Sequence, residues 1–141
     1  MLVIDIDDFK KINDKCGHDV GDQVLREFSD VIRSTLRKVD QIFRFGGEEF
    51  VILLPRLDLE SAYRAAERLR KGIERNPFGI NHNGEPIQIT ASIGGAIFPD
   101  NALGETALFK AADDACYAAK NEGKNRVIFA NCERDFRVDL D

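Results

Sequence analysis

Two short acidic segments hold the residues whose types and spacing are best suited to chemistry. Segment 46–50 reads Gly-Gly-Glu-Glu-Phe and lies between two apolar runs, 41–45 and 50–54. Paired glycines suit the positive backbone dihedrals of a tight turn, so the pattern predicts a hairpin tip that carries two carboxylates. Segment 5–8 reads Asp-Ile-Asp-Asp and follows the apolar run 2–4. Because carboxylates at strand ends are the usual ligands of a hard divalent cation, the two segments together indicate a metal-dependent site.

The composition argues against several classes of function. A chain of 141 residues is long enough for one domain with its own core. The net charge of −5 and the pI of about 5.1 argue against a general nucleic-acid or membrane-surface binder, because those partners need a basic field. Any anionic ligand must therefore be held by a local cluster of cations.

Cysteine usage and hydropathy favour a cytoplasmic domain. Cys16, Cys116 and Cys132 are odd in number and lack metal-ligand spacing, so we expect reduced thiols and no structural disulfide. No apolar run approaches the ~20 residues that span a bilayer, and the run 1–4 is too short for a signal peptide. We expect no direct insertion of this domain into a membrane.

Hydrophobic periodicity predicts the elements that position the acidic segments. Residues 2–6 are typical of a strand, and the polar stretch 10–19 is typical of a loop. Apolar residues at four-residue spacing predict a helix over 21–37, with the Asp22 carboxylate in its first turn. The hairpin follows, and Asp58 is placed to cap a second helix that ends near Asn-Pro at about residue 76.

The second half of the chain predicts a small hairpin and a further strand. Asn83-Gly84 is a turn signal within 78–88. Residues 87–97 are rich in β-branched side chains, which favours a strand. Gly94-Gly95 in this strand indicates a bulge or a close approach of another backbone.

The last predicted elements complete the fold class. A helix is predicted over 106–121, ended by Gly123, and a strand over 126–129 precedes a charged tail, 131–141. The order β-α-β-β-α-β, with an additional helix and the small hairpin, predicts a ferredoxin-like α/β sandwich in one domain over 1–130.

Further short motifs accompany the two acidic segments. They are Asn-Asp at 13–14, Gly-His at 17–18, Gly-Asp at 21–22, Thr-Ala-Ser-Ile-Gly at 90–94, Ala-Asp at 112–113, Tyr-Ala-Ala-Lys at 117–120 and Gly-Lys-Asn at 123–125. With these motifs in this order, the chain resembles the GGDEF family of diguanylate cyclases from residue 2 to about residue 127. The resemblance implies a nucleotidyl-cyclase palm-like fold and the condensation of two GTP molecules into cyclic di-GMP with release of pyrophosphate. The helix and loop that usually precede the family's first strand are missing, so we expect a fragment of a longer sequence.

The resemblance implies a metal site and catalytic residues. Asp5, Glu48 and the Ile6 carbonyl match the family's ligands of Mg²⁺ or Mn²⁺, the ion that such chemistry needs to bridge phosphates and activate a 3′-hydroxyl. Glu48 and Glu49 are the expected catalytic residues, and Glu49 resembles the residue that assists deprotonation or metal binding. The open alternatives are a solvated strand-end carboxylate for Asp5 and an exposed hairpin carboxylate for Glu49.

The resemblance also implies how GTP is bound. Asn13 and Asp22 match the guanine contacts, and an Asp acceptor pairs with the N1 and N2 donors of guanine, for which adenine has no equivalent. The main chain at Phe9 and Lys10 and the side chains of Lys120 and Lys124 match positions near the triphosphate. The alternative for Asp22 is a first-turn carboxylate that the helix dipole stabilises, and the alternative for Lys120 is a solvated last-turn lysine.

Two neighbouring residues need separate interpretation. Lys124 stands where the family usually has arginine, so it keeps a point charge and loses the bidentate fork that binds phosphate. His18 could serve as a general base, but the resemblance gives it no chemical step, and we interpret it as a structural loop residue.

Segment 37–40, Arg-Lys-Val-Asp, indicates a second site. It matches the RxxD inhibitory motif of the family, in which the product cyclic di-GMP binds and restrains the enzyme. Arg37 and Asp40 would contact phosphate and guanine edges, Arg68 is expected to join them, and Arg64 is a further candidate. The alternative is a surface ion pair of little energetic weight.

The resemblance finally implies partners. Each subunit of a homodimer holds one GTP, so two half-sites must face each other for catalysis. We expect an upstream sensory or receiver domain in the full-length protein, through which the whole could be anchored to a membrane. The alternative functions are a catalytically weak or inactive cyclic di-GMP receptor and, more distantly, a GTP-binding effector module.

Overall fold

A computed structural model of the protein describes residues 1–131. The elements in chain order are β1 (Leu2–Ile6), α1 (Phe9–Cys16), α2 (His18–Thr35), β2 (Gln41–Arg44), β3 (Glu49–Leu53), α3 (Leu59–Arg75), β4 (Pro77–Ile80), β5 (Pro86–Gln88), β6 (Ala91–Gly95), α4 (Glu105–Asn121) and β7 (Val127–Phe129). Cys132 and the predicted tail beyond Asn131 lie outside the described residues.

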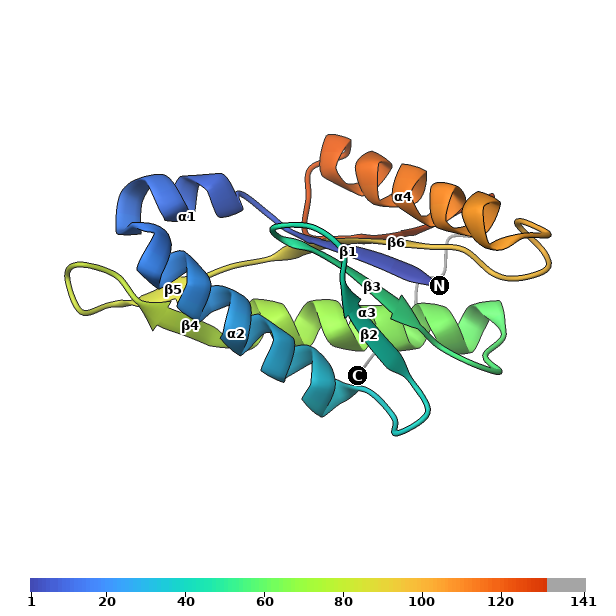
Figure 1. The fold of residues 1–141 in the computed structure, drawn as a ribbon, viewed down its shortest axis with the longest axis horizontal. Helices are drawn as coiled ribbons and strands as arrows, with labels where there is room; N and C mark the ends of the chain where they lie inside the picture. The colour runs from blue at the N-terminus through green and yellow to red at the C-terminus, as the bar shows by residue number, and fades with distance from the viewer. Residues whose placement is uncertain (132–141) are drawn as a thin grey trace.

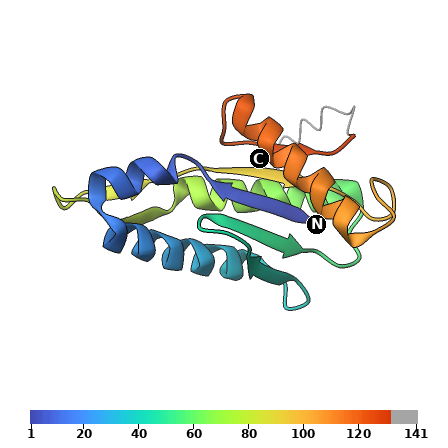
Figure 2. The same ribbon diagram turned by 45° about the horizontal axis from the view of Figure 1, so that its top comes forward.

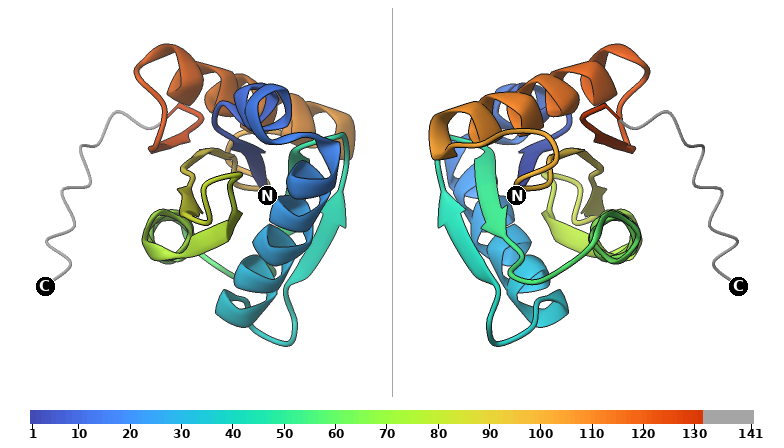
Figure 3. Two further views of the ribbon diagram at one scale, coloured as in Figure 1. Left: turned by 90° about the vertical axis from the view of Figure 1, so that its left-hand side faces the viewer. Right: turned by 90° about the vertical axis from the view of Figure 1, so that its right-hand side faces the viewer.

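One five-stranded sheet, in the order β2-β3-β1-β6-β7, forms the middle layer. Its neighbouring strands are antiparallel except β6 and β7, which are parallel. Helix α4 covers one face of the sheet, and α2 and α3 cover the other (Figures 1 and 3). The predicted fold class is therefore confirmed, because β1-α2-β2-β3-α3-β6 is the β-α-β-β-α-β core and α4, β7 and the β4-β5 hairpin are additions.

The central strand β1 sorts its side chains between the two faces of the sheet. Leu2, Ile4 and Ile6 are buried in the larger cluster, which includes side chains of α2 and α3. Val3 belongs to the smaller cluster with Ala112 and Cys116 of α4. Since side chains alternate along a strand, Asp5 follows Val3 onto the face that α4 covers.

The prediction of a loop over 10–19 is wrong. Residues from Phe9 to Cys16 form the short helix α1, and only Gly17, with φ of 85°, separates it from α2. Phe9 and Ile12 contact the core from one side of this helix, so an amphipathic pattern is present but too short and too polar to recognise. Because α2 begins at His18, its first turn contains Asp19, and Asp22 lies beyond that turn.

Other helix and strand positions agree better with the sequence. Asp58 caps α3 as predicted, because its side chain accepts a hydrogen bond from the backbone N–H of Ser61 at 2.8 Å. The predicted strand 87–97 is divided in the structure: Ile87 and Gln88 belong to β5 of the hairpin, and only Ala91–Gly95 form β6 in the sheet. Gly84, with φ of 77°, lies between β4 and β5, as the turn signal indicated.

Gly94 allows α4 to lie directly on the sheet. A Cβ atom at this position would lie 2.1 Å from the carbonyl oxygen of Ala112 and 2.2 Å from the backbone nitrogen of Cys116. Both atoms belong to the backbone of α4 and cannot rotate away. Of the two interpretations offered for the Gly-Gly pair in β6, the close approach is confirmed.

We expect the substitution Gly94→Ala to lower the free energy of unfolding by at least about 2 kcal/mol, because the new methyl group would overlap the α4 backbone. Urea denaturation followed by circular dichroism measures this. The matched control is Gly72→Ala in α3, where the nearest atom, Oγ1 of Thr35, is 3.9 Å away. The control should stabilise the protein by about 0.5–1 kcal/mol, and equal effects of both changes would contradict the account.

Candidate active site

The turn after β1 and the tip of the β2-β3 hairpin lie side by side at one end of the sheet (Figures 1 and 2). Asp5 and Glu49 are directly paired in the antiparallel register of β1 and β3. The backbone N–H of Ile6 donates a hydrogen bond to the carbonyl of Glu48 at 3.3 Å. The pairing of the strands therefore brings the two acidic segments of the sequence together.

A cavity of about 200 Å³ opens between these segments and the end of α4. Its lining includes the three predicted metal ligands and four of the predicted GTP-binding residues. The lining residues are Asp5, Ile6, Asp7, Asp8, Phe9, Lys10, Glu48, Lys120 and Lys124.

The two carboxylate oxygens of Asp5 lie in different surroundings at the cavity. Its Oδ2 lies 2.5 Å from Nζ of Lys120, the last-turn lysine of α4. Its Oδ1 is buried without a hydrogen-bond partner among the described residues. Burial raises the pKa of Asp5, and the ion pair with Lys120 opposes that change. A carboxylate with one oxygen on an ammonium group and the other left unsatisfied is a suitable ligand for a cation.

The predicted metal site contains too few side-chain ligands to enclose a cation. Within residues 1–131, no group of three or more His, Cys, Asp and Glu side chains converges in a way that could hold a metal ion. The predicted set consists of two carboxylates, Asp5 and Glu48, and a main-chain carbonyl. It would therefore need further oxygen ligands from water or from phosphate groups of a bound nucleotide.

Glu49 is not among the residues that line the cavity, but it is paired with Asp5 across the sheet and lies beside Asp113 of α4. Burial and, after it, a hydrogen bond with the side chain of Asp113 together raise the pKa of Glu49 to about 7. In the sequence, Asp113 stands out only as part of the Ala-Asp motif at 112–113, with no predicted role of its own. The side-chain pairing depends on how α4 crosses the hairpin, which no local pattern in the sequence indicates.

Lys124 is also paired with a carboxylate. Its Nζ lies 2.6 Å from Oδ1 of Asp8, and this hydrogen bond holds the pKa of Asp8 below its usual range. Both predicted phosphate-binding lysines, Lys120 and Lys124, are thus neutralised by acids of segment 5–8. An incoming anion together with a divalent cation could replace these two ion pairs.

The predicted guanine contacts lie on α1 and α2, away from the cavity lining. Asn13 projects from α1 onto α2 at Gly21, where an added Cβ atom would lie only 1.8 Å from Oδ1 of Asn13. Asp22 is the next residue along α2 and is exposed. Since α2 begins at His18, the interpretation of Asp22 as a first-turn carboxylate is wrong. His18 is an exposed residue in the first turn of α2, not in a loop.

Cys16 and Cys116, the two cysteines among the described residues, are free thiols. Cys116 lies under the site, where its thiol is 3.4 Å from the carbonyl oxygen of Ser92. Burial raises the pKa of the Cys116 thiol to about 12, so it stays protonated at neutral pH. Cys16 is half-buried at the end of α1.

The second predicted site is a separate hollow of about 220 Å³ between α2, α3 and the end of β3. Arg37, Asp40, Arg64 and Arg68 all line it. Arg37 and Asp40 bind each other, because the guanidinium donates to both carboxylate oxygens, at 2.7 Å in the shortest contact. Arg37 also donates to the Pro55 carbonyl oxygen at 2.9 Å.

A family model described as the diguanylate cyclase GGDEF domain matches residues 1–126. The chain belongs to the GGDEF family. Among curated relatives, this GGDEF domain is 48% identical over 130 residues to diguanylate cyclase DgcP of Pseudomonas aeruginosa. The match covers 92% of this chain and 19% of DgcP, so the chain spans about a fifth of that relative's length.

Solved structures support the same assignment for the GGDEF domain. The GGDEF domain of YfiN, also called TpbB, from Pseudomonas aeruginosa superposes with a TM-score of 0.87 at 36% identity, covering 93% of this chain and 81% of that one. The GGDEF domain of DgcB from Caulobacter crescentus, solved in complex with c-di-GMP, gives a TM-score of 0.84 at 34% identity and covers 93% and 77% of the two chains. Within residues 1–131, no helix combines the length and apolar character that a membrane span requires.

Because the pKa of Glu49 is raised in the folded protein, we expect the protein to become less stable as the pH rises, when EDTA keeps metal ions from the site. The Glu49 carboxyl keeps its proton up to about pH 7 in the folded state, whereas the unfolded chain loses it near the ordinary pKa of 4.5. The free energy of unfolding should therefore decrease as the pH rises from about 4.5 to about 7. In Glu49→Gln we expect this decrease to be smaller by about 1 kcal/mol, a difference that stays this small because solvent screens the half-buried carboxyl in the parent. Urea titrations at pH 5 and 7.5 measure the difference. A decline of the same size in Glu49→Gln would contradict this origin.

Proposed function

We propose that this GGDEF domain condenses two molecules of GTP into cyclic di-GMP, with release of two molecules of pyrophosphate. The observation that carries the proposal is the cavity in which Asp5 and Glu48 face Lys120 and Lys124. Acidic ligands for a divalent cation and basic groups for phosphates are what phosphoryl transfer requires at one place. The similarity to DgcP, named as a diguanylate cyclase, supports the same reaction.

The carboxylates of Asp5 and Glu48 and the carbonyl of Ile6 would hold Mg²⁺ or Mn²⁺. The unsatisfied buried Oδ1 of Asp5 supports this fit, because a cation would supply its missing partner. When bound, the ion would neutralise phosphate charge and lower the pKa of an attacking 3′-hydroxyl.

The remaining residues of the site would bind and orient GTP. Lys120 would leave Asp5, and Lys124 would leave Asp8, so that each ammonium group contacts phosphate oxygens. The main chain at Phe9 and Lys10 would lie beneath the triphosphate. Lysine at position 124 binds as a point charge, without the two parallel hydrogen bonds that arginine forms with phosphate.

Base selection would come from α1 and α2. Asn13 and Asp22 would contact guanine, with the Asp22 carboxylate accepting from its N1 and N2 donors, so that GTP is favoured over ATP. Gly21 leaves the space that the Asn13 side chain occupies beside Asp22. Glu49 would assist deprotonation of the 3′-hydroxyl, and a pKa of about 7 suits a general base at neutral pH.

Catalysis would need a homodimer. Cyclisation joins two nucleotides, whereas the cavity at the end of β1 holds the groups for one triphosphate. Two copies would therefore face each other with one GTP each. An upstream sensory or receiver domain in the full-length protein would control how often the two copies meet.

We expect a GGDEF domain fused to a dimerising helix to form cyclic di-GMP from GTP and Mg²⁺, and Glu48→Ala to lower the rate at least about 100-fold, because a metal ligand is lost. Chromatography of the nucleotide products measures the rate. The control Lys110→Ala removes an exposed ion pair with Asp114 on α4 and should leave the rate unchanged. Equal rates for the parent and Glu48→Ala would contradict the metal site.

The hollow lined by Arg37, Asp40, Arg64 and Arg68 would bind the product and restrain the enzyme. Three guanidinium groups around one hollow in a chain of net charge −5 support an anionic ligand. The c-di-GMP complex of DgcB's GGDEF domain supports this ligand class. Arg37 would have to share or release its bonds to Asp40 for both side chains to contact the dinucleotide.

We expect Arg68→Ala to weaken cyclic di-GMP binding about tenfold or more, through loss of a charge-assisted contact, and to leave the initial rate of GTP turnover unchanged. Isothermal calorimetry and the product assay measure the two quantities. Arg68 suits this test because none of the hydrogen bonds or ion pairs found for the described residues involves it, whereas Arg37 also supports the fold through Asp40 and Pro55. Unchanged binding in Arg68→Ala would remove Arg68 from the site.

A non-catalytic cyclic di-GMP receptor is the second candidate function, and the arginine-lined hollow favours it independently of the cavity at β1. Tight binding of cyclic di-GMP by a dimerised domain that forms no product from GTP would select this alternative.

A further inference from the structure

The loop between α4 and β7 has an unusual backbone where it carries Lys124. Lys124 has φ of 64° and Asn125 has φ of 46°, so two consecutive residues other than glycine are left-handed. This region is unfavourable for lysine in particular and persists only where surrounding contacts enforce it. The contacts that hold the loop therefore decide where the Lys124 side chain can reach.

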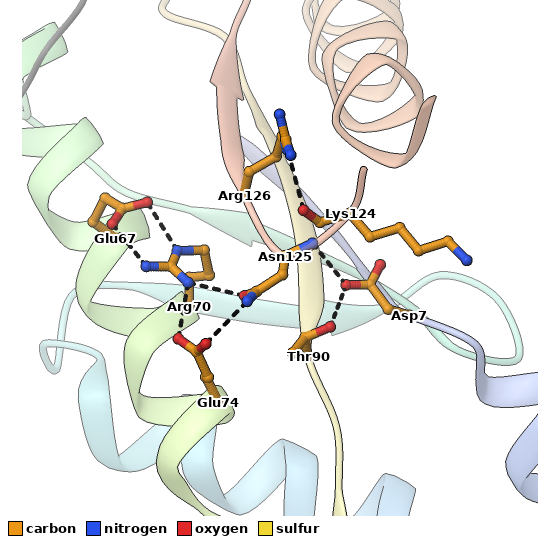
Figure 4. Close-up of polar contacts among 8 residues, drawn as sticks. All are labelled: Asp7, Glu67, Arg70, Glu74, Thr90, Lys124, Asn125 and Arg126. Atoms are coloured by element: carbon orange, nitrogen blue, oxygen red, sulfur yellow. Dashed lines mark hydrogen bonds and ion pairs between the residues drawn. The ribbon is translucent and has the colours of Figure 1, made fainter. Parts of the chain in front are cut away.

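Asn125 makes three of those contacts (Figure 4), and the backbone N–H of Lys124 adds a hydrogen bond to the Ala119 carbonyl of α4 at 3.0 Å. The backbone N–H of Asn125 donates to Oδ2 of Asp7 at 3.0 Å, which fixes the loop to the end of β1. Its side-chain amide donates to Oε1 of Glu74 at 3.0 Å and accepts from Arg70 at 2.9 Å, both on α3. Figure 4 shows Asn125 directed toward α3 and Lys124 extended the other way.

Arg70 is itself held in place. Its guanidinium donates to both carboxylate oxygens of Glu67, at 3.0 and 3.2 Å, and to Glu74 at 3.0 Å. The Arg70 and Glu67 side chains are only 13% and 15% exposed. A largely buried, bidentate ion pair is far more rigid than a surface pair, so α3 offers Asn125 a fixed donor.

We propose that Asn125, held by Arg70 and Glu74 of α3, is a positioning residue that fixes Lys124 at the phosphate end of the cavity. This inference rests on the proposed binding of GTP there and adds three residues outside the cavity lining, Asn125, Arg70 and Glu74. Lys124 reaches Asp8 at 2.6 Å because its backbone is held in the left-handed region. Without the Asn125 side chain, the loop loses its attachment to α3, and the Lys124 ammonium group spends less time where phosphate would bind.

A double-mutant cycle on the 141-residue chain tests the proposal. The ligand is a GTP analogue with a methylene group between the α- and β-phosphorus atoms, with Mg²⁺, and calorimetry gives its Kd. We expect Asn125→Ala to weaken binding about tenfold in the parent and less than about twofold in Lys124→Ala, because Asn125 acts through Lys124. Equal weakening in both backgrounds, or a lower Tm with an unchanged Kd, would overturn the proposal.

Two further variants keep the outcome clear. Glu74→Ala removes the acceptor of the Asn125 amide. The Glu74 side chain is 45% exposed, so this variant should fold and can replace Asn125→Ala in the same cycle if Asn125→Ala does not fold. Lys110→Ala, which breaks an exposed ion pair on α4, should leave the Kd unchanged.

If the parent chain does not bind the analogue, the proposed GTP site fails, and the positioning role fails with it. If the parent binds and Lys124→Ala alone weakens binding, only the positioning role is overturned.

Discussion

The buried carboxylate of Asp7 is the contact on which the geometry of the site depends. It is 6% exposed and accepts hydrogen bonds from the hydroxyl groups of Thr90 and Ser92, at 2.7 and 2.6 Å, and from the backbone N–H of Asn125. A buried charge is tolerated only when its oxygens are satisfied in this way. These bonds join the end of β1, the start of β6 and the loop before β7, so the walls of the cavity are fixed to one another.

The side chains of β1, the strand that precedes Asp7, alternate between the two faces of the sheet. Ile4 and Ile6 face α2 and α3 and anchor the strand in the larger core. Asp5 faces α4, where burial raises the pKa of its carboxyl group and the ion pair with Lys120 lowers it. Gly94 lets α4 come close enough for Lys120 to reach Asp5. The core packing and the chemistry of the site therefore depend on the same strand and helix.

The sequence predicted those features that depend on neighbouring residues. The two acidic segments, the Asp58 cap and the amphipathic helices rest on short patterns, and the structure contains them. Helix α1 was missed because only Phe9 and Ile12 mark its buried side within eight mostly polar residues. A two-contact signal of this kind does not distinguish a short helix from a polar loop.

The parts of the site that could not be predicted depend on contacts between distant segments. The pairing of Glu49 with Asp113 and the attachment of Asn125 to Arg70 join residues more than fifty positions apart. Each needs the packing of a whole helix before the side chains meet. By contrast, the ion pair of Arg37 with Asp40, only three residues away, is the alternative that the sequence itself offered for segment 37–40.

The central claim is that Asp5 and Glu48 hold a divalent cation beside a triphosphate. A crystal structure of the chain with Mn²⁺ and the methylene-bridged GTP analogue tests it most directly, because the anomalous scattering of manganese locates the ion. We expect a manganese peak within ligating distance of Asp5 and Glu48, with Lys120 moved from Asp5 to a phosphate oxygen. A nucleotide bound with manganese elsewhere, and with the ion pair between Lys120 and Asp5 intact, would contradict it.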